Sequence, residues 1–192
     1  MSTYCTEVDI ENYLLTNIDP SFSTQITAWI EAVSAHIEKY TGRIFVADSV
    51  ASARLFEGKS SNKLLIDECV AVTVVEQGDT YGENFTTVSS GDYQLLPYNE
   101  IPKTAIGLKR TVWGLGVHRI TAKWGYSVAV PADIKFAATV LASGIVWAQV
   151  YPNGSKKSEQ IGNYEVSFKD EKGDADYDRA MAILDSYRRI NL

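Results

Sequence analysis

Most hydrolases and transferases need a nucleophile with a basic side chain, usually histidine, within hydrogen-bond reach. The chain has only two histidines, His36 and His118. The first lies beside the apolar stripe of a predicted helix and the second in or beside a predicted strand, so both are expected to be surface or packing residues. The two cysteines, Cys5 and Cys69, give no metal-ligand spacing with them. We therefore expect no catalytic residues, no metal site, no cofactor and no enzymatic activity.

Two groups of carboxylates resemble catalytic pairs but have simpler explanations. Asp67 and Glu68 are expected to mark a turn between two strands. Asp174, Asp176 and Asp178 are expected to favour the beginning of a helix, where the helix dipole stabilises acids. A Trp-Gly-Leu-Gly segment lacks the third glycine and the strand–helix context of a phosphate-binding loop.

The formal charge is −6 over 192 residues, which disfavours adsorption to DNA or to anionic lipid. The basic pairs are isolated and are expected to be solvated: Lys109-Arg110, Lys156-Lys157 and Arg188-Arg189. No apolar run approaches the roughly 20 residues of a membrane span, so no membrane is expected as a partner. The first residues lack a secretory signal, which predicts a reducing compartment and free thiols.

Helical patterns occupy the N-terminal part of the chain. Thr6 is the predicted N-cap of a first helix that ends near Thr16. A second helix is predicted by a stripe of apolar residues spaced three and four apart, with Gly42 just past its end. The stripe consists of Ile26, Ile30, Val33, Ile37 and Tyr40.

Two further helices are predicted near the C-terminus. One opens at Pro131 and ends before Tyr151, and it carries several small residues that would let another helix approach closely. An alternating segment, Ile161 to Lys169, is predicted to be extended. The last helix is predicted from Asp174 to Ile190, with the basic pair at 188–189 in its final turn.

Between residues 50 and 128 the apolar pattern becomes short and alternating, with glycines and asparagines in the gaps. The predicted strands are 54–58, 63–67, 70–75, 93–96, 106–109 and 119–124. The fold class is therefore predicted to be α+β. It is a helical bundle of four main helices, residues 1–49 and 129–192, with an antiparallel β-rich insertion, residues 50–128, between the second and third helices.

Several segments carry a family resemblance, in order along nearly the whole chain. Residues 30–45 (IEAVSAHIEKYTGRIF) form a helix that ends in a Tyr-Thr-Gly-Arg-x-Phe motif. The other segments are 4–7 (YCTE), 93–97 (YQLLP), 123–126 (KWGY), 130–137 (VPADIKFA), 158–168 (SEQIGNYEVSF) and 187–189 (YRR). As a set they resemble the head–tail connector (adaptor) family of tailed bacteriophages. The β-rich insertion departs from compact members of that family, which are nearly all helical.

The resemblance implies a structural subunit of the phage neck. In this family the subunits form a ring, usually of twelve copies in heterologous contact. The ring joins the portal vertex of the head to the tail or the next neck protein. Its partners would be further copies of itself, the portal protein, and a stopper or tail-proximal neck protein. DNA would pass through the lumen without sequence-specific binding. The protein would be found in the neck of the virion, and in the host cytoplasm during assembly.

The resemblance also suggests two sets of contact residues. The subunit–subunit interface is expected to involve Trp29, Val33, Ile37 and Trp147. The C-terminal segment would dock on the portal, because a polar segment followed by an amphipathic helix can become ordered on binding. The expected portal contacts are Tyr187, Arg188, Arg189 and Leu192.

Two other interpretations stay open at this point. The protein could be a different neck or tail-completion protein, which the identity of its partner would decide. It could also be a carbohydrate- or ligand-binding module that uses the aromatic residues of the β-rich insertion. That second interpretation requires an exposed aromatic platform, and its candidate residues are Tyr93, Tyr98, Trp113, Trp124 and Tyr126.

Overall fold

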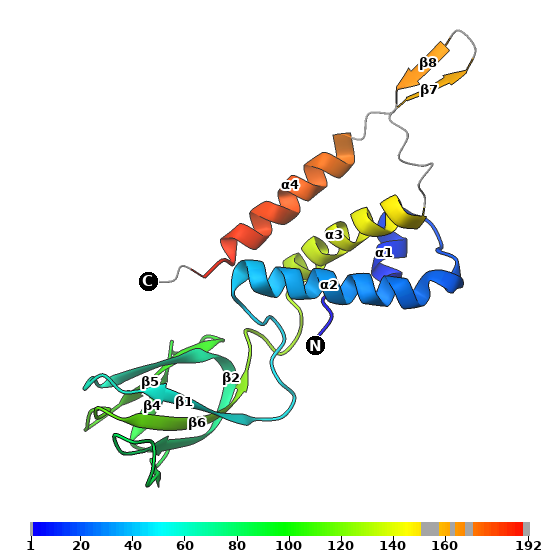
Figure 1. Ribbon diagram of the computed structural model, residues 1–192. Helices are drawn as coiled ribbons and strands as arrows, with labels where there is room; N and C mark the ends of the chain where they lie inside the picture. The colour runs from blue at the N-terminus through cyan, green and yellow to red at the C-terminus, as the bar shows by residue number, and fades with distance from the viewer. Residues whose placement is uncertain (1, 151–157, 162–163, 168–170, 190–192) are drawn as a thin grey trace. The chain divides into compact units, whose positions relative to one another are not determined.

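Helices lie at both ends of the chain, and strands lie between them (Figure 1). A computed structural model describes residues 2–150, 158–161, 164–167 and 171–189, with side chains at 2–150 and 175–189. The chain divides into a helical unit, residues 1–43 with 130–192, and a β unit, residues 44–129. The described helices are α1 (Glu7–Leu14), α2 (Ser23–Thr41), α3 (Ala132–Val150) and α4 (Glu171–Ser186). The predicted α+β class, with the strands between the second and third helices, is confirmed.

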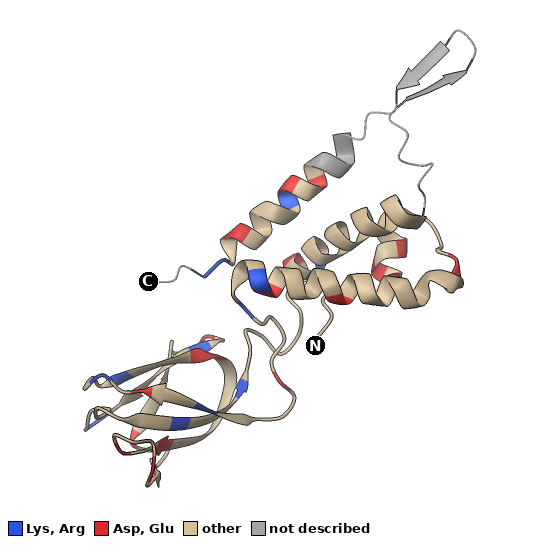
Figure 2. Cartoon of the chain, in the orientation of Figure 1, with Lys and Arg blue, Asp and Glu red and all other residues tan. Residues whose placement is uncertain are grey.

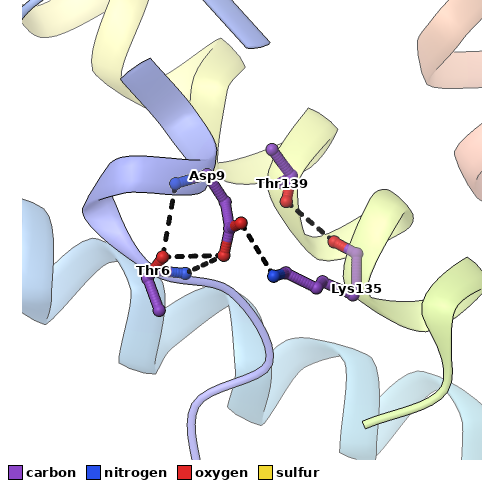
Figure 3. Close-up of polar contacts among 4 residues, drawn as sticks. All are labelled: Thr6, Asp9, Lys135 and Thr139. Carbon is purple, nitrogen blue, oxygen red and sulfur yellow. Dashed lines mark hydrogen bonds and ion pairs between the residues drawn. The ribbon is translucent and has the colours of Figure 1, made fainter. Parts of the chain in front are cut away.

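The first helix begins at a capping box (Figure 3). The Thr6 hydroxyl accepts a hydrogen bond from the Asp9 backbone N–H at 3.2 Å, and the Asp9 carboxylate accepts one from the Thr6 N–H at 2.9 Å. These bonds satisfy backbone donors that the first turn of a helix leaves free. Thr6 is therefore the N-cap that the sequence predicts. A 3₁₀ turn, Pro20–Phe22, then leads into α2.

The helix α3 is the centre of the helical unit, because α1, α2 and α4 each pack against it. Its buried face is largely small: Ala137, Ala138, Ala142 and Ser143 are at most 1% exposed. Ile26, Ile30, Val33 and Ile37 of α2 and Ala180 and Leu184 of α4 are also buried in this unit. By length and composition α3 would suit a membrane span. The buried core helix of a packed bundle meets the same criteria, and 44% of this stretch is buried.

Polar side chains link the helices at the edge of this core. Lys135 of α3 forms an ion pair with Asp9 of α1, with 2.8 Å between Nζ and Oδ1 (Figure 3). The hydroxyl of Tyr13 in α1 donates to Asp176 of α4 at 2.7 Å. The Tyr4 hydroxyl donates to Glu38 of α2 at 2.6 Å. Directional contacts thus hold α1 to α3 and α4, and the segment before α1 to α2, in addition to apolar packing.

The β unit is an antiparallel sheet in the order β1-β6-β2-β5-β4, with β3 paired to β2. The strands are β1 (Ser52–Glu57), β2 (Lys63–Gln77), β3 (Thr86–Thr87), β4 (Tyr93–Leu96), β5 (Lys103–Leu108) and β6 (Val117–Trp124). The first part of β2 pairs with β5 and the second part with β6. One strand therefore belongs to two successive ladders.

The turn predicted at Asp67 and Glu68 is wrong. Both residues lie inside β2, which continues from Lys63 to Gln77 with register shifts near Cys69. Glu68 and Cys69 are consecutive and both buried, so the alternation of a regular strand is broken there. The backbone carbonyl of Glu68 accepts a hydrogen bond from Gly125 N–H at 2.8 Å. The polar pair marks an irregularity that lets one strand change partners.

Two tryptophans fill the core of the β unit. Trp113 and Trp124 are 0% and 1% exposed. Each indole N–H donates to a backbone carbonyl, that of Ile106 at 3.0 Å and that of Ser52 at 2.8 Å. Buried indoles commonly satisfy their N–H in this way. Along β6, buried residues alternate with half-buried ones, as the sequence pattern predicts.

The last helix differs from the prediction at both ends. It spans Glu171–Ser186, so Arg188 and Arg189 lie beyond it and not in its final turn. Tyr187 and Arg188 donate their N–H groups to carbonyls three residues earlier, which tightens the end of the helix. The N–H of Arg189 then donates to the carbonyl of Thr41 in α2 at 2.9 Å. The chain leaves the helix because this backbone bond holds it to α2. The extended segment predicted before α4 is a hairpin of β7 (Ser158–Ile161) and β8 (Tyr164–Ser167).

The capping box makes a prediction about acid stability. Burial opposes ionisation of Asp9, but hydrogen bonds from Lys135 and Thr6 outweigh it and hold the pKa of this carboxyl below its ordinary value. A depressed folded pKa gives stability that is present above the unfolded pKa, about 3.9, and lost as the pH falls through the folded pKa. We therefore expect Asp9→Asn to unfold more readily than the unchanged chain in urea at pH 7, with a difference that narrows below about pH 4.

Two further variants make this measurement specific. Thr6→Ala should cost about 1 kcal/mol of unfolding free energy, the usual effect of removing an N-cap side chain. Glu31→Gln also removes one negative charge, but it does so at an exposed position of α2 and should change little. If Asp9→Asn and Glu31→Gln had equal stability at pH 7, the stabilising role of the Asp9 carboxylate would be wrong.

Candidate functional site

The C-terminal segment is fastened to the helical unit. The hydroxyl of Tyr187 donates to Asp133 at the beginning of α3 at 2.8 Å. The Tyr187 carbonyl accepts a hydrogen bond from the Arg43 side chain at 2.5 Å. Of the residues predicted to contact a portal, Tyr187 and Arg189 are half-buried and Arg188 is exposed. Leu192 lies outside the described residues.

A pocket of about 320 Å³ opens where this segment meets the last turns of α2. It is lined by His36, Lys39, Tyr40 and Arg188. We call this site the basic pocket, because Lys and Arg side chains form much of its wall. The His36 ring stacks with the Tyr40 ring at 6.4 Å between centroids, and the Arg188 guanidinium lies 5.6 Å from the centre of the Tyr40 ring.

Tyr40 is fixed at the edge of the basic pocket by a hydrogen bond from its hydroxyl to Asp185 of α4. That hydrogen bond raises the pKa of the Tyr40 hydroxyl. The Asp185 carboxylate is thereby held at the same edge of the pocket. The pocket thus presents the Tyr40 ring with the Lys39 and Arg188 side chains beside it. Such a surface suits a carboxylate next to an apolar group.

The four residues predicted for the subunit interface fall into two classes. Val33 and Ile37 are 5% and 0% exposed, so they belong to the core of the helical unit and leave little surface for a second subunit. Trp29 and Trp147 are half-buried at the surface of α2 and α3. An apolar stripe shows which face of a helix is buried, but not which molecule buries it. The stripe of α2 is buried by the other helices of the same chain.

The other surface of interest is at the end of α1. Leu15 is 87% exposed and has a left-handed backbone, with φ of 54°. This conformation costs a residue with a side chain roughly 1 kcal/mol or more, and glycine or asparagine usually occupies it. Val8 is 61% exposed and Asn12 is exposed, so with Leu15 they form one exposed stripe at spacings of four and three.

Cys5, Cys69 and His118 are buried, whereas His36 is exposed on α2. Within the part of the chain that the structure describes, no group of three or more His, Cys, Asp and Glu side chains is placed to hold a metal ion. Cys5 and Cys69 are free, as predicted, and both are buried. Burial, with Asp9 near Cys5 and Asp67 near Cys69, raises the pKa of each thiol to about 11. Both thiols are therefore protonated near neutral pH and are poor nucleophiles.

His118 is a packing residue inside the β unit. Its side chain is 1% exposed, and its ring lies 4.8 Å from that of Trp113. Nε2 is 3.2 Å from the Gly114 carbonyl, so this nitrogen carries the proton. Nδ1 has no hydrogen-bond partner among the described residues. Burial lowers the pKa of His118, and the bond to Gly114 offsets only part of that effect.

The five aromatic residues proposed for a platform are not exposed together. Trp113 and Trp124 are in the core, and Tyr93 and Tyr126 are half-buried. Among the five candidates only Tyr98 is exposed, at 57%. A carbohydrate ring usually needs a flat exposed aromatic face, which the two buried indoles do not offer.

No family model matches the sequence, and no curated protein matches it. Solved structures do match. The chain is similar to a protein in the neck of an empty GTA particle computed with C6 symmetry, at 12% identity and a TM-score of 0.59, over 96% of this chain and 89% of that chain. It is also similar to one in the neck of a native GTA particle computed with C12 symmetry, at 14% identity and a TM-score of 0.56, over 96% and 88%.

A third similar structure is the virion of a native gene transfer agent (GTA) particle, at 16% identity and a TM-score of 0.53, over 88% of this chain and 79% of that chain. At these identities the similarity establishes the fold. The chain has the fold of proteins found in gene transfer agent necks, and its resemblance to head–tail connectors is confirmed at that level. Because 96% of the chain is covered, the β unit belongs to the fold shared with the neck proteins.

The basic pocket was not predicted from the sequence, although Arg188 was singled out. His36, Lys39 and Tyr40 are spaced by three and one, so a helical projection places them on adjoining parts of one face. Their approach to Arg188, far along the chain, depends on how the helices pack. Leu15 was part of a predicted helix, and its left-handed conformation is not visible in the sequence.

His118 generates a testable prediction. Its folded pKa lies below the unfolded value of about 6.5, so the unfolded chain binds the proton more readily. The contribution of neutral His118 to the free energy of unfolding is complete above the unfolded pKa of about 6.5. It is lost as the pH falls from there towards the folded pKa. Urea unfolding followed by tryptophan fluorescence should show this loss, with a slope of at most about 1.4 kcal/mol per pH unit for one proton.

In His118→Gln this component of the pH dependence should be absent. His36→Gln, which changes an exposed histidine of the helical unit, should retain it and is the matched control. An identical pH slope in His118→Gln and the unchanged chain would show that His118 is not the group responsible.

Proposed function

We propose that the protein is a structural subunit of the neck of a phage-like particle. It would form a ring of twelve subunits between the portal vertex of the head and the tail or next neck protein. The observation that carries this proposal is the shared fold over 96% of the chain with proteins in necks computed with C6 and C12 symmetry. The role is structural and not enzymatic, and DNA passes through the ring.

The charge of the chain supports passage of DNA without retention. With a formal charge of −6, the protein has no excess of cations to bind phosphates tightly. Sliding through a ring requires weak contact with the backbone of DNA at every position, which a net negative surface favours.

We propose that the C-terminal segment contacts the portal, with Arg188 as its best placed residue. Tyr187 and Arg189 are fixed to the helical unit, so they would position the segment, while Arg188 is exposed. The residues that follow, which include Leu192, would extend the contact. Deleting all of α4 would be a poor test, because Ala180 and Leu184 are 0% exposed and belong to the core.

A second candidate is a different position in the neck or tail. The same fold would serve a tail-completion protein, and only the partner distinguishes the two. A ligand-binding role for the β unit has less support, because Trp113 and Trp124 are buried. It would be revived if the isolated fragment of residues 50–128 bound oligosaccharides.

Electron microscopy of the purified chain mixed with the portal from the same genome tests the proposed function. We expect rings stacked on the narrow end of the portal, with one copy of this chain for each portal subunit. Failure of the two proteins to associate, together with binding to a tail protein, would favour the second candidate.

Point variants test the portal contact at concentrations where the free chain is monomeric. Arg188→Glu reverses one exposed charge and should weaken portal binding at least tenfold, which corresponds to about 1.4 kcal/mol. Arg110→Glu makes the same change at an exposed residue of the β unit and should bind as the unchanged chain does. Equal affinities of the two variants would remove Arg188 from the portal contact.

A further inference from the structure

We propose that the end of α1 in one copy of this chain docks into the basic pocket of the next copy. The docking surface on α1 consists of Val8, Glu11, Asn12 and Leu15, and we call it the α1 stripe. The receiving site is the basic pocket defined above. This inference rests on the proposed function, since it names the contact by which neighbouring subunits of the ring would recognise each other.

Leu15 is the first reason to regard the α1 stripe as a docking surface. Its side chain is 87% exposed, and its left-handed backbone would suit glycine or asparagine better. Within one chain, a leucine there accepts backbone strain and buries almost nothing in return. Departures of this kind from local preference are concentrated at functional sites. An apolar anchor for another molecule would account for leucine at this position.

Charge is the second reason. The helical unit has 15 Asp and Glu against 10 Lys and Arg, so a second copy presents a mainly acidic surface. Figure 2 shows acidic residues along α1 and in the turn before α2, and a basic residue near the C-terminal end of α2. Glu11 lies within the α1 stripe, and Glu7 and Asp19 lie close to it in the chain. Lys39 would face these acids across the contact, while Arg188, which also lines the pocket, stays available to the portal.

The chemistry of the two surfaces is complementary in detail. The pocket, of about 320 Å³, is open to solvent, and the Leu15 side chain would lie in it against the Tyr40 ring. Lys39 lies beside that ring and suits the carboxylate of Glu11. Glu11 already accepts a hydrogen bond from the Ile18 N–H at 2.8 Å through Oε1, which holds its carboxylate in place beside the stripe. A fixed carboxylate loses less entropy on binding than a mobile one.

The positions of the two surfaces suit a ring. The α1 stripe leads into the N-terminal end of α2, whereas the basic pocket lies at the C-terminal end of the same helix. α2 has 19 residues, so these ends are about 28 Å apart. A contact between two different surfaces of identical chains is heterologous. It forms a closed ring when the rotation between subunits closes.

Self-association of the full chain, measured by sedimentation equilibrium without any portal, tests the docking. Asn12→Lys places a positive charge on the α1 stripe opposite Lys39, and Lys39→Glu places a negative charge in the pocket opposite Glu11. Both residues are exposed, so neither change should unfold the chain. We expect each single variant to associate at least tenfold more weakly than the unchanged chain. Lys59→Glu, an exposed change in the β unit, should not weaken association.

The double variant Asn12→Lys with Lys39→Glu should recover association, because the new charges attract each other. An equimolar mixture of the two single variants should also recover, because the two chains can alternate around a ring. Leu15→Asn should raise the melting temperature, since asparagine accepts the left-handed backbone, and yet weaken association at least threefold. A gain in stability together with a loss of binding would separate docking from folding.

Three results would overturn the docking. The first is that the unchanged chain stays monomeric up to about 1 mM. At that concentration even a weak association of about 4 kcal/mol would be half complete. The second is equal association of Lys39→Glu and Lys59→Glu. The third is a double variant that remains as weak as the single ones. None of these results concerns the portal, so placement in the neck would still be decided by the electron microscopy described above.

Discussion

The small side chains of α3 determine how closely the helices of the helical unit approach one another. Ala137, Ala138 and Ala142 are all 0% exposed. They bring the backbone of α3 near three other helices, including α4, which lies far from α1 and α2 in the sequence. Because α4 packs there, the segment after it reaches the end of α2, where Arg189 bonds to Thr41, and the beginning of α3, where Tyr187 bonds to Asp133. The basic pocket exists only because of this packing.

The β unit depends on a different constraint, the irregularity in β2. A strand that pairs with β5 and then with β6 has to bend, and two consecutive buried residues at 68 and 69 accompany the change of partner. Gly125, with φ of 143°, lies where an added side chain would come within 2.4 Å of Ala47. The unit thereby encloses Trp113 and Trp124. Its aromatic residues stabilise the fold, and the exposed surfaces that we connect with function lie in the helical unit.

Local features of the sequence predicted much of the fold. The structure confirms three local features: Thr6 as an N-cap, Gly42 after α2 and the beginning of α3 after Pro131. They could be predicted because each depends on neighbours within one turn. The errors came from distant contacts. Asp67 and Glu68 have the composition of a turn, but pairing on both sides keeps them in a strand. α4 ends at Ser186 because a carbonyl of α2 binds the N–H of Arg189.

The candidate sites show the same limit more sharply. Val33 and Ile37 were predicted at an interface, and their pattern marks a buried face without stating what buries it. The basic pocket joins residues 36–40 to Arg188, a proximity that no local pattern contains. Leu15 could be placed near a helix end, but its exposure and left-handed backbone are properties of the folded chain. Function in this protein is therefore best sought in surfaces made by tertiary packing.

We propose that this chain occupies the neck of a particle as a ring. The most direct measurement is electron microscopy of particles in which the chain carries a compact fused label. Our account predicts density from the label in one symmetric layer, directly below the portal vertex. Label found on the capsid shell or at the distal tip of the tail, or absent from assembled particles, would contradict it.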